Sequence, residues 1–172
     1  MDFTILTTNI VNYVGLCEQL PADNIVKILN ENYFGIIHPT LNKFDGELEN
    51  IIGDRQTAYW RNSKKNNGSF LACSSALEIL KNIKIDQETL SSENRFKVNI
   101  AITSGQATEV ENILFGDIVN LNSQLLSICQ RHKVPILIDE NTHLMLNGEL
   151  SSREIDSVYL NERDLVKLYE LF

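Results

Sequence analysis

One acidic side chain is a candidate for chemistry, because the residues around it predict a hairpin with that side chain at its tip. The stretch from Phe44 to Trp60 reads FDGELENIIGDRQTAYW. It predicts two short strands joined by a tight turn at Gly53-Asp54, since Gly and Asp commonly occupy such turns. The Asp54 carboxylate therefore has two interpretations: a turn former, or a metal ligand held at the edge of a sheet.

The other residue types that bind metals or phosphate are scattered along the chain. His38, His132 and His143 have no Cys or carboxylate at ligand spacing, so we expect surface or hydrogen-bonded histidines. The pair Lys64-Lys65 lies in the polar run SKKNNGS and is expected to be a solvated loop rather than a phosphate clamp. Asp117 follows Gly116 and is expected to cap a helix.

Hydrophobic periodicity predicts an α+β fold with helices packed on one face of a mainly antiparallel sheet. Strands are expected over 3–11, in the hairpin, and over 96–102, 112–115, 134–138, 157–160 and 164–171, the last two joined by a turn at 161–162. Helices are expected after Pro21, with a kink or restart at Pro39, and over 70–83, 118–129 and 139–147, with a polar loop over 85–94. A length of 172 residues is that of one domain, 1–172.

The composition of the chain indicates which classes of ligand it is unsuited to bind. A net charge of -8 and a pI near 4.9 argue against a nucleic-acid polymer or an anionic membrane, whereas a nucleotide could be bound through metal ions and backbone amides. The cysteines Cys17, Cys73 and Cys129 have no CxxC spacing and are expected to be reduced and buried. The start, MDFTILTTNI, does not have the pattern of a signal peptide, and no run of 18 apolar residues occurs, so a cytoplasmic location is expected.

Four strings, taken in order, resemble the catalytic domain of the class III adenylate and guanylate cyclases. They are FTILTTNIVNY, LNENYFGIIHPTLNKFDGELENIIGD, FKVNIAITSGQ and FGDIVNLNSQL. The family's strings run roughly F-x-D-I-x-x-[FY], G-G-x-x-x-K-x-x-G-D, a strand ending in T-G, and G-D-x-V-N-x-A-x-R-L. The resemblance covers nearly the whole chain. It implies a ferredoxin-like cyclase fold, a central sheet flanked by helices, and a head-to-tail homodimer with active sites between the protomers.

The resemblance also implies a site for two divalent ions, Mg²⁺ or Mn²⁺, which activate the attacking ribose 3′-oxygen and hold the triphosphate. In the family two carboxylates bridge these ions, one at the end of the first strand and one at the hairpin tip. Asp54 occupies the hairpin position and Asn9 the first-strand position. An amide oxygen can ligate Mg²⁺ but brings no negative charge.

The implied nucleotide-binding residues are altered as well. The purine-reading Lys of the family is Asn50 here, and the second purine-reading position falls at Ile113. Asn120 matches the family's ribose-binding Asn, although it also fits a helix-entry or core-facing amide. Gln124 stands at the position of the catalytic Arg, one helical turn later. Loss of one such preorganised donor typically costs about 10²–10³ in rate.

These substitutions predict a cyclase-homology domain of intracellular signalling with little or no cyclase activity. It would bind ATP or GTP together with Mg²⁺ or Mn²⁺, or act through a protein partner and need no cofactor. The alternative is an active purine nucleotide cyclase, which converts ATP or GTP to cAMP or cGMP and pyrophosphate, alone or with a partner chain. A likeness only to the fold, as in diguanylate cyclases, is disfavoured because the hairpin reads IIGDR rather than GGDEF.

Overall fold

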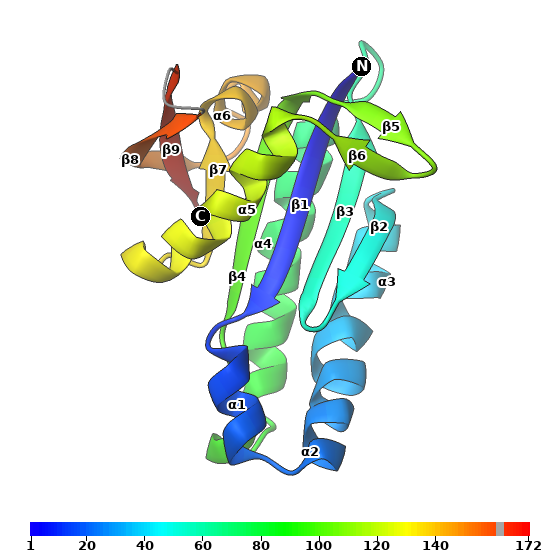
Figure 1. The fold of residues 1–172 in the computed structure, drawn as a ribbon, viewed down its shortest axis with the longest axis vertical. Coiled ribbons are helices and arrows are strands. Elements are labelled where there is room, and N and C mark those ends of the chain that lie inside the picture. The colour runs from blue at the N-terminus through cyan, green and yellow to red at the C-terminus, as the bar shows by residue number, and fades with distance from the viewer. Residues whose placement is uncertain (161–163) are drawn as a thin grey trace.

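A seven-stranded sheet runs through the molecule in the computed structural model, which describes residues 1–160 and 164–172 (Figure 1). Its strands lie in the order β2-β3-β1-β4-β7-β9-β8. Their bounds are β1 Asp2–Ile10, β2 Glu47–Ile52, β3 Arg55–Arg61, β4 Val98–Gln106, β7 Ile136–Asp139, β8 Ser152–Leu160 and β9 Asp164–Leu171. The neighbours β4 and β7 are parallel and the other described pairs are antiparallel. The predicted mainly antiparallel α+β fold is confirmed.

Helices and one small ribbon complete the fold. The helices are α1 Tyr13–Gln19, α2 Ala22–Lys27, the π-helical η1 Ile28–Phe34, α3 Gly35–Lys43, α4 Gly68–Gln87, the short 3₁₀ turn η2 Ser92–Asn94, α5 Asp117–His132 and α6 Glu140–Leu146. Strands β5 (Thr108–Val110) and β6 (Ile113–Phe115) form a separate two-stranded ribbon. Across the part of the chain that the structure describes, no helix is both long enough and apolar enough to span a bilayer.

Helices cover both faces of the sheet, so the prediction of one covered face was wrong. Ile100 and Ile102 of β4 belong to the core that α3 and α4 share, whereas Ala101 between them packs with α5. Successive side chains of a strand point to opposite faces, so these two clusters lie on opposite sides of the sheet. In Figure 1, α4 lies behind the central strands and α5 lies in front of them.

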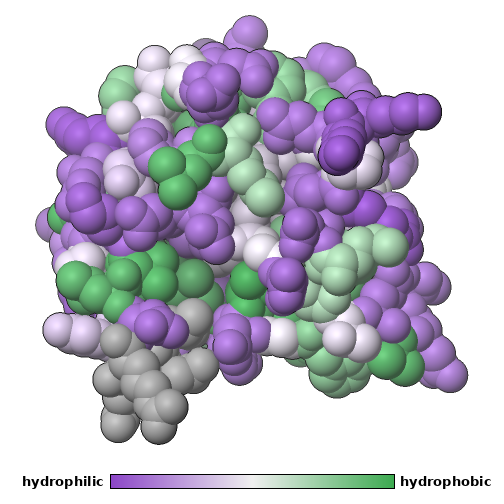
Figure 2. Space-filling view, turned by 90° about the horizontal axis from the view of Figure 1, so that it is seen from above, coloured by the Kyte–Doolittle hydropathy of each residue, from purple (hydrophilic) through white to green (hydrophobic). Residues whose placement is uncertain are grey.

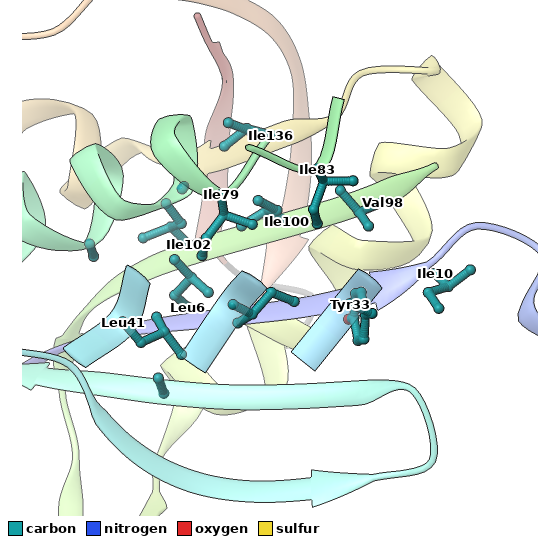
Figure 3. Close-up of a cluster of buried hydrophobic side chains, with 14 of the residues drawn as sticks. Leu6, Ile10, Tyr33, Leu41, Ile79, Ile83, Val98, Ile100, Ile102 and Ile136 are labelled. Atoms are coloured by element: carbon teal, nitrogen blue, oxygen red, sulfur yellow. The ribbon is translucent and has the colours of Figure 1, made fainter. Parts of the chain in front are cut away.

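The larger core fills the space between the sheet and the helices α3 and α4 (Figure 3). Leu6 and Ile10 of β1 face Tyr33 and Leu41 there, with Ile79 and further aliphatic side chains around them. Tyr33 is fully buried, and its hydroxyl lies 2.7 Å from the Thr8 hydroxyl. A buried hydroxyl needs such a partner, because an unsatisfied one would cost more than the bond itself contributes.

Strand β1 is buried on both faces, as its β-branched sequence predicts. Its residues from Phe3 to Thr8 are all buried. Thr4 lies 2.8 Å from the Ser69 hydroxyl and 2.9 Å from the Ser104 hydroxyl, and Thr7 lies 3.1 Å from the Thr57 hydroxyl. The threonines therefore tolerate burial, and β1 can occupy the middle of the sheet as the frame for the candidate site.

Several local predictions differ from the structure. Helix α4 continues to Gln87, so the predicted loop over 85–94 starts later, and β4 begins at Val98 rather than at Phe96. Helix α1 and strand β5 were not predicted, and the predicted turn at 161–162 lies outside the described residues. Burial by neighbouring elements moves such boundaries, because the local pattern alone does not fix where an element ends.

Three single-residue predictions also need correction. Pro39 lies inside α3, and the helix irregularity is the π-helical segment that ends just before Gly35, four residues earlier. A proline ring crowds the backbone carbonyl of the residue four positions before it, and for Pro39 that residue is Gly35. The N-cap of α5 is Gly116, with Asp117 as the first helical residue. Cys73 and Cys129 are buried as predicted, but Cys17 is exposed on α1.

Candidate nucleotide and metal site

The tip of the β2–β3 hairpin lies against the end of β1. The Ile10 backbone N–H donates a hydrogen bond of 2.7 Å to Oδ2 of Asp54. Gly53 makes the turn possible with a φ of 62°, a left-handed backbone angle that glycine adopts without strain. Burial raises the pKa of the half-buried Asp54 carboxyl, and the hydrogen bond from Ile10 offsets part of this rise. Asp54 is thus both a turn residue and a carboxylate placed at the end of β1.

Asn9, the other predicted metal position, lies one residue before this contact. It is half-buried, and its Oδ1 is buried without a hydrogen-bond partner in the described residues. Its cross-strand neighbour on β4 is Asn99, whose Nδ2 is likewise buried without a partner in that part of the chain. A buried acceptor without a partner is uncommon in a folded protein. The Asn9 amide oxygen is therefore available to a water molecule or a cation at the end of β1.

The donor set at the end of β1 does not fit a pair of divalent ions. Asp54 supplies one negative charge, and Ile10 N already occupies one of its oxygens. Asn9 supplies a neutral oxygen, so the two side chains together cannot bridge and neutralise two dications. In residues 1–160 and 164–172 there is also no group of three or more His, Cys, Asp or Glu side chains that could hold a metal ion.

The two predicted purine positions lie on neighbouring pieces of the fold. Asn50 is half-buried on β2, opposite Thr57 of β3. Its neighbour Glu49 accepts a hydrogen bond of 2.6 Å from the backbone N–H of Leu114 on β6. Ile113, next to Leu114, is 45% exposed and offers no polar side-chain atom to a base. The Glu49 contact therefore brings these positions near each other, but only Asn50 can hydrogen-bond a purine edge.

Asn120 and Gln124 lie one turn apart on α5 and are both exposed. The side chains that α5 buries against the sheet are Ile118, Leu121, Asn122, Leu125, Leu126, Ile128 and Cys129. Since Asn120 and Gln124 lie on the other side of the helix, the structure does not bring them into contact with Asp54 or Asn9 of the same chain. The predicted site would require a second protomer to combine them.

An amide next to the candidate site residues that sequence reasoning missed is Asn122, whose role is structural. It is 2% exposed, and its Nδ2 donates hydrogen bonds of 3.2 Å to Ile5 O, 3.1 Å to Ala101 O and 3.2 Å to Thr103 Oγ1. These contacts fix α5 on β1 and β4. The sequence signal that could have found Asn122 is its spacing from Asn120. The two residues are two positions apart, so on a helix their amides point to different sides and only one of them can face solvent.

The prediction of surface or hydrogen-bonded histidines is wrong for His38, which is half-buried and whose Nε2 is buried without a hydrogen-bond partner in the described residues. The predictions for the other two histidines and for the lysine pair are confirmed. His132 lies 2.7 Å from Asp156 and His143 lies 2.8 Å from the Ser152 hydroxyl, so both are satisfied by protein groups. Lys64 and Lys65 are exposed.

A family model described as the adenylate and guanylate cyclase catalytic domain matches residues 1–171. No curated protein matches the chain in sequence. The adenylyl cyclase CyaB from P. aeruginosa superimposes with a TM-score of 0.81 at 18% identity, over 99% of this chain and 93% of that one.

Two further structures show the same fold. The guanylate cyclase domain of RhGC from Catenaria anguillulae, solved in complex with GTP, gives a TM-score of 0.78 at 17% identity, over 99% of this chain and 96% of that one. A bacterial light-regulated adenylyl cyclase gives 0.84 at 18% identity, over 99% of this chain and 52% of that one, so this chain spans about half of that protein. Identities this low show a shared fold, whereas the family model spans almost the whole chain. The chain belongs to the adenylate and guanylate cyclase catalytic domain family.

Proposed function

We propose that residues 1–172 form one cyclase-homology domain of intracellular signalling with little or no cyclase activity. The observation that carries this proposal is the pair at the end of β1, where Asp54 is a carboxylate and Asn9 is a neutral amide with a buried, unpartnered oxygen in the described chain. Phosphoryl transfer by two metal ions depends on carboxylates that bind both ions at once. Asp54 alone does not supply the charge and the oxygens that two such ions need.

The domain keeps enough of the family's site to bind a nucleotide. Asp54 is in place at the hairpin tip, Asn120 is exposed on α5, and the turns at Gly53 and Gly116 offer backbone amides. Solved relatives are described in complex with GTP and with ATPalphaS. We propose ATP or GTP as the ligand, with a single Mg²⁺ or Mn²⁺ held jointly by Asp54 and the phosphates. A cytoplasmic location, where these nucleotides are found, follows from this proposal.

Two observations support a homodimer or another protein partner. Strand β2 is an edge strand, and it exposes Leu48, Ile51 and Ile52. The β5–β6 ribbon exposes three more apolar side chains, Val110, Ile113 and Phe115. Figure 2 looks onto the end of the molecule where this ribbon lies, and hydrophobic groups are visible there among hydrophilic ones. Exposed apolar side chains on adjoining elements are typical of protein contacts.

The decisive experiment is turnover by the purified chain with Mn²⁺ and each of ATP, GTP, CTP and UTP, with cyclic nucleotides detected by mass spectrometry. Mn²⁺ is chosen because it binds mixed amide and carboxylate ligands more tightly than Mg²⁺ does. We expect no cyclic product. The matched control is a triple variant, Asn9→Asp, Asn50→Lys and Gln124→Arg, which restores three of the four altered family positions in the same fold and should form a Mn²⁺-dependent product.

The alternative, an active purine nucleotide cyclase, makes the opposite prediction. A cyclic product from the unmodified chain that disappears in Asp54→Ala would overturn the proposal and would show that Asn9 completes the metal site. If the unmodified chain is inactive, equilibrium dialysis with ATP and GTP separates a nucleotide-binding role from a role in protein contact alone.

A further inference from the structure

A groove of about 990 Å³ lies at the end of the sheet where β1 ends and where β4 and β7 begin. Four segments of the chain line it: Val11 just after β1, the last turns of α4, the start of β4 with the residues before it, and the stretch from the end of α5 to β7. Strand β4 begins at Val98, but its pairing with β7 begins only at Ile100, whose N–H donates to Pro135 O at 2.7 Å. The first residues of β4 therefore lack a neighbour on that side, which leaves the groove open.

The walls of the groove are apolar. Its apolar lining residues are Val11, Leu80, Ile83, Phe96, Val98, Val134 and Pro135. Ile83 and Val98 belong to the main core and lie close together in the close-up (Figure 3). A volume near 990 Å³ and a largely hydrophobic lining are typical of sites for small organic molecules, which usually measure about 300–1,000 Å³.

The rim of the groove is positively charged in a chain with a net charge of -8. Its charged lining residues are Lys84, Arg95, Lys97 and Lys133, and the lining contains no Asp or Glu. None of these four cations takes part in an ion pair within residues 1–160 and 164–172. Four cations gathered around one groove create a local positive potential that the acidic surface elsewhere does not share.

Two side-chain amides at the groove add to this potential. Gln87 accepts a hydrogen bond of 2.7 Å from Phe96 N through its Oε1, while its Nε2 is buried without a partner in the described chain. Asn99 is 4% exposed, and its Nδ2 is buried and equally without a partner there. Both residues line the groove. Unpaired N–H donors carry partial positive charge, so they favour an anion nearby.

We propose that this groove binds an amphiphilic organic anion with an apolar chain and a single carboxylate or phosphate head. The apolar walls would take the chain, and the cations of the rim would hold the head. A nucleotide fits this lining less well than such an anion, because the polar groups of its base and ribose would lie against the aliphatic walls. The groove adjoins the candidate nucleotide site at Asn99, the cross-strand neighbour of Asn9, but the inference does not rest on the proposed function.

The groove is connected to the candidate site through β1. Val11 lines the groove and donates its N–H to Lys97 O at 2.8 Å, and Asn99 is the cross-strand neighbour of Asn9. A ligand in the groove would therefore contact Val11, two residues after Asn9, and Asn99, opposite Asn9, which gives the domain a route for a regulatory input.

Isothermal titration calorimetry with three probes of equal chain length tests the proposal. The probes are decanoate, decyl phosphate and uncharged decanol, each kept below its aggregation concentration. We expect decanoate or decyl phosphate to bind the full chain at least about tenfold more tightly than decanol, which corresponds to about 1.4 kcal/mol. ATP in excess should not displace the anion.

The cations are tested with Lys84→Gln/Lys97→Gln, which removes two exposed charges from the rim. Exposed charge contacts each contribute modestly, so binding of the anion should weaken about 5–20-fold while decanol binding stays within about twofold. The control, Lys64→Gln/Lys65→Gln, removes the same charge from an exposed loop that does not line the groove. It should leave both affinities unchanged.

Amide chemical shifts in ¹⁵N-labelled protein locate the bound probe. The largest changes are expected at Lys97, Val98, Asn99 and Val134. The proposal is overturned if neither anion binds more tightly than decanol, if both double variants weaken the anion equally, or if the shifts change elsewhere. Thermal unfolding of each variant shows whether it is folded, so that a folding defect is not counted as lost binding.

Discussion

The Asp54 carboxylate accepts a hydrogen bond of 2.7 Å from the backbone N–H of Ile10, so the tip of the β2–β3 hairpin is fixed to the end of β1. This bond joins two groups of the protein itself. It gives Asp54 a structural role in addition to the role that the family assigns to its position. The first prediction separates these two roles.

Asp54→Ala should lower the free energy of unfolding by about 1–3 kcal/mol, because it leaves the Ile10 N–H without its charged acceptor. Asp54→Asn keeps an oxygen at that place and should cost less. Urea unfolding in the absence of divalent ions measures both. Glu31→Ala, at an exposed helical position, serves as the control for loss of one negative charge and should stay within about 0.5 kcal/mol. Equal stability of Asp54→Ala and the unmodified chain would contradict a structural role.

Asn9→Asp should create a cation site at the end of β1. A second carboxylate beside Asp54 adds ligand charge, so we expect Mn²⁺ to bind at least about tenfold more tightly. Without metal the two carboxylates repel each other, and the variant should be less stable than the unmodified chain by about 1–2 kcal/mol. Titration of the unfolding temperature with Mn²⁺ measures both effects. Asn12→Asp, an exposed position just beyond β1, should show neither effect.

Asn122→Ala should destabilise the protein by about 2–4 kcal/mol, because it removes the amide whose two hydrogens are shared among three acceptors on the central strands, and it leaves a small cavity. Asn120→Ala is the matched control in the same helix, since Asn120 is exposed, and it should change stability by no more than about 0.5 kcal/mol. Urea unfolding of the two variants gives the comparison. Similar costs for both would show that the Asn122 contacts do not hold α5.

Because of the buried Asp139 side chain, we expect the free energy of unfolding to fall as the pH rises. Its side chain is 2% exposed and caps α6, with Oδ1 accepting from Thr142 N at 3.1 Å, Thr142 Oγ1 at 2.5 Å and Ser104 N at 3.2 Å. Burial raises its pKa from 3.8 to about 6. A raised pKa means that the folded state holds the proton more tightly than the unfolded state. The stabilisation is therefore complete below pH 3.8 and is lost as the pH rises to about 6.

That loss amounts to about 2–3 kcal/mol, at about 1.4 kcal/mol per unit of pKa. Asp139→Asn keeps the capping oxygen but cannot ionise, so this part of the pH dependence should disappear. Urea midpoints at pH 3.5 and pH 7.5, for the unmodified chain and the variant, give the difference. Identical pH dependence in both proteins would show that Asp139 does not titrate in this range.

The sequence by itself determined the features that depend on near neighbours along the chain. Gly53 and Asp54 require a turn because of backbone sterics, and the β-branched run of β1 predicts a strand buried on both faces. The string around Asn9, together with the hairpin string, indicates the family and predicts an altered metal position at Asn9. These signals are local, so no knowledge of packing was needed to find them.

Only the tertiary structure decided which elements share a core. Ile100, Ala101 and Ile102 form one apolar run, and such a run does not reveal that helices cover both of its faces. Asn120 and Asn122 are identical residues, and their roles differ because only the position of α5 on the sheet exposes one and buries the other. The cationic groove combines residues from four segments between Val11 and Pro135, and only the packing of these segments brings their charges together.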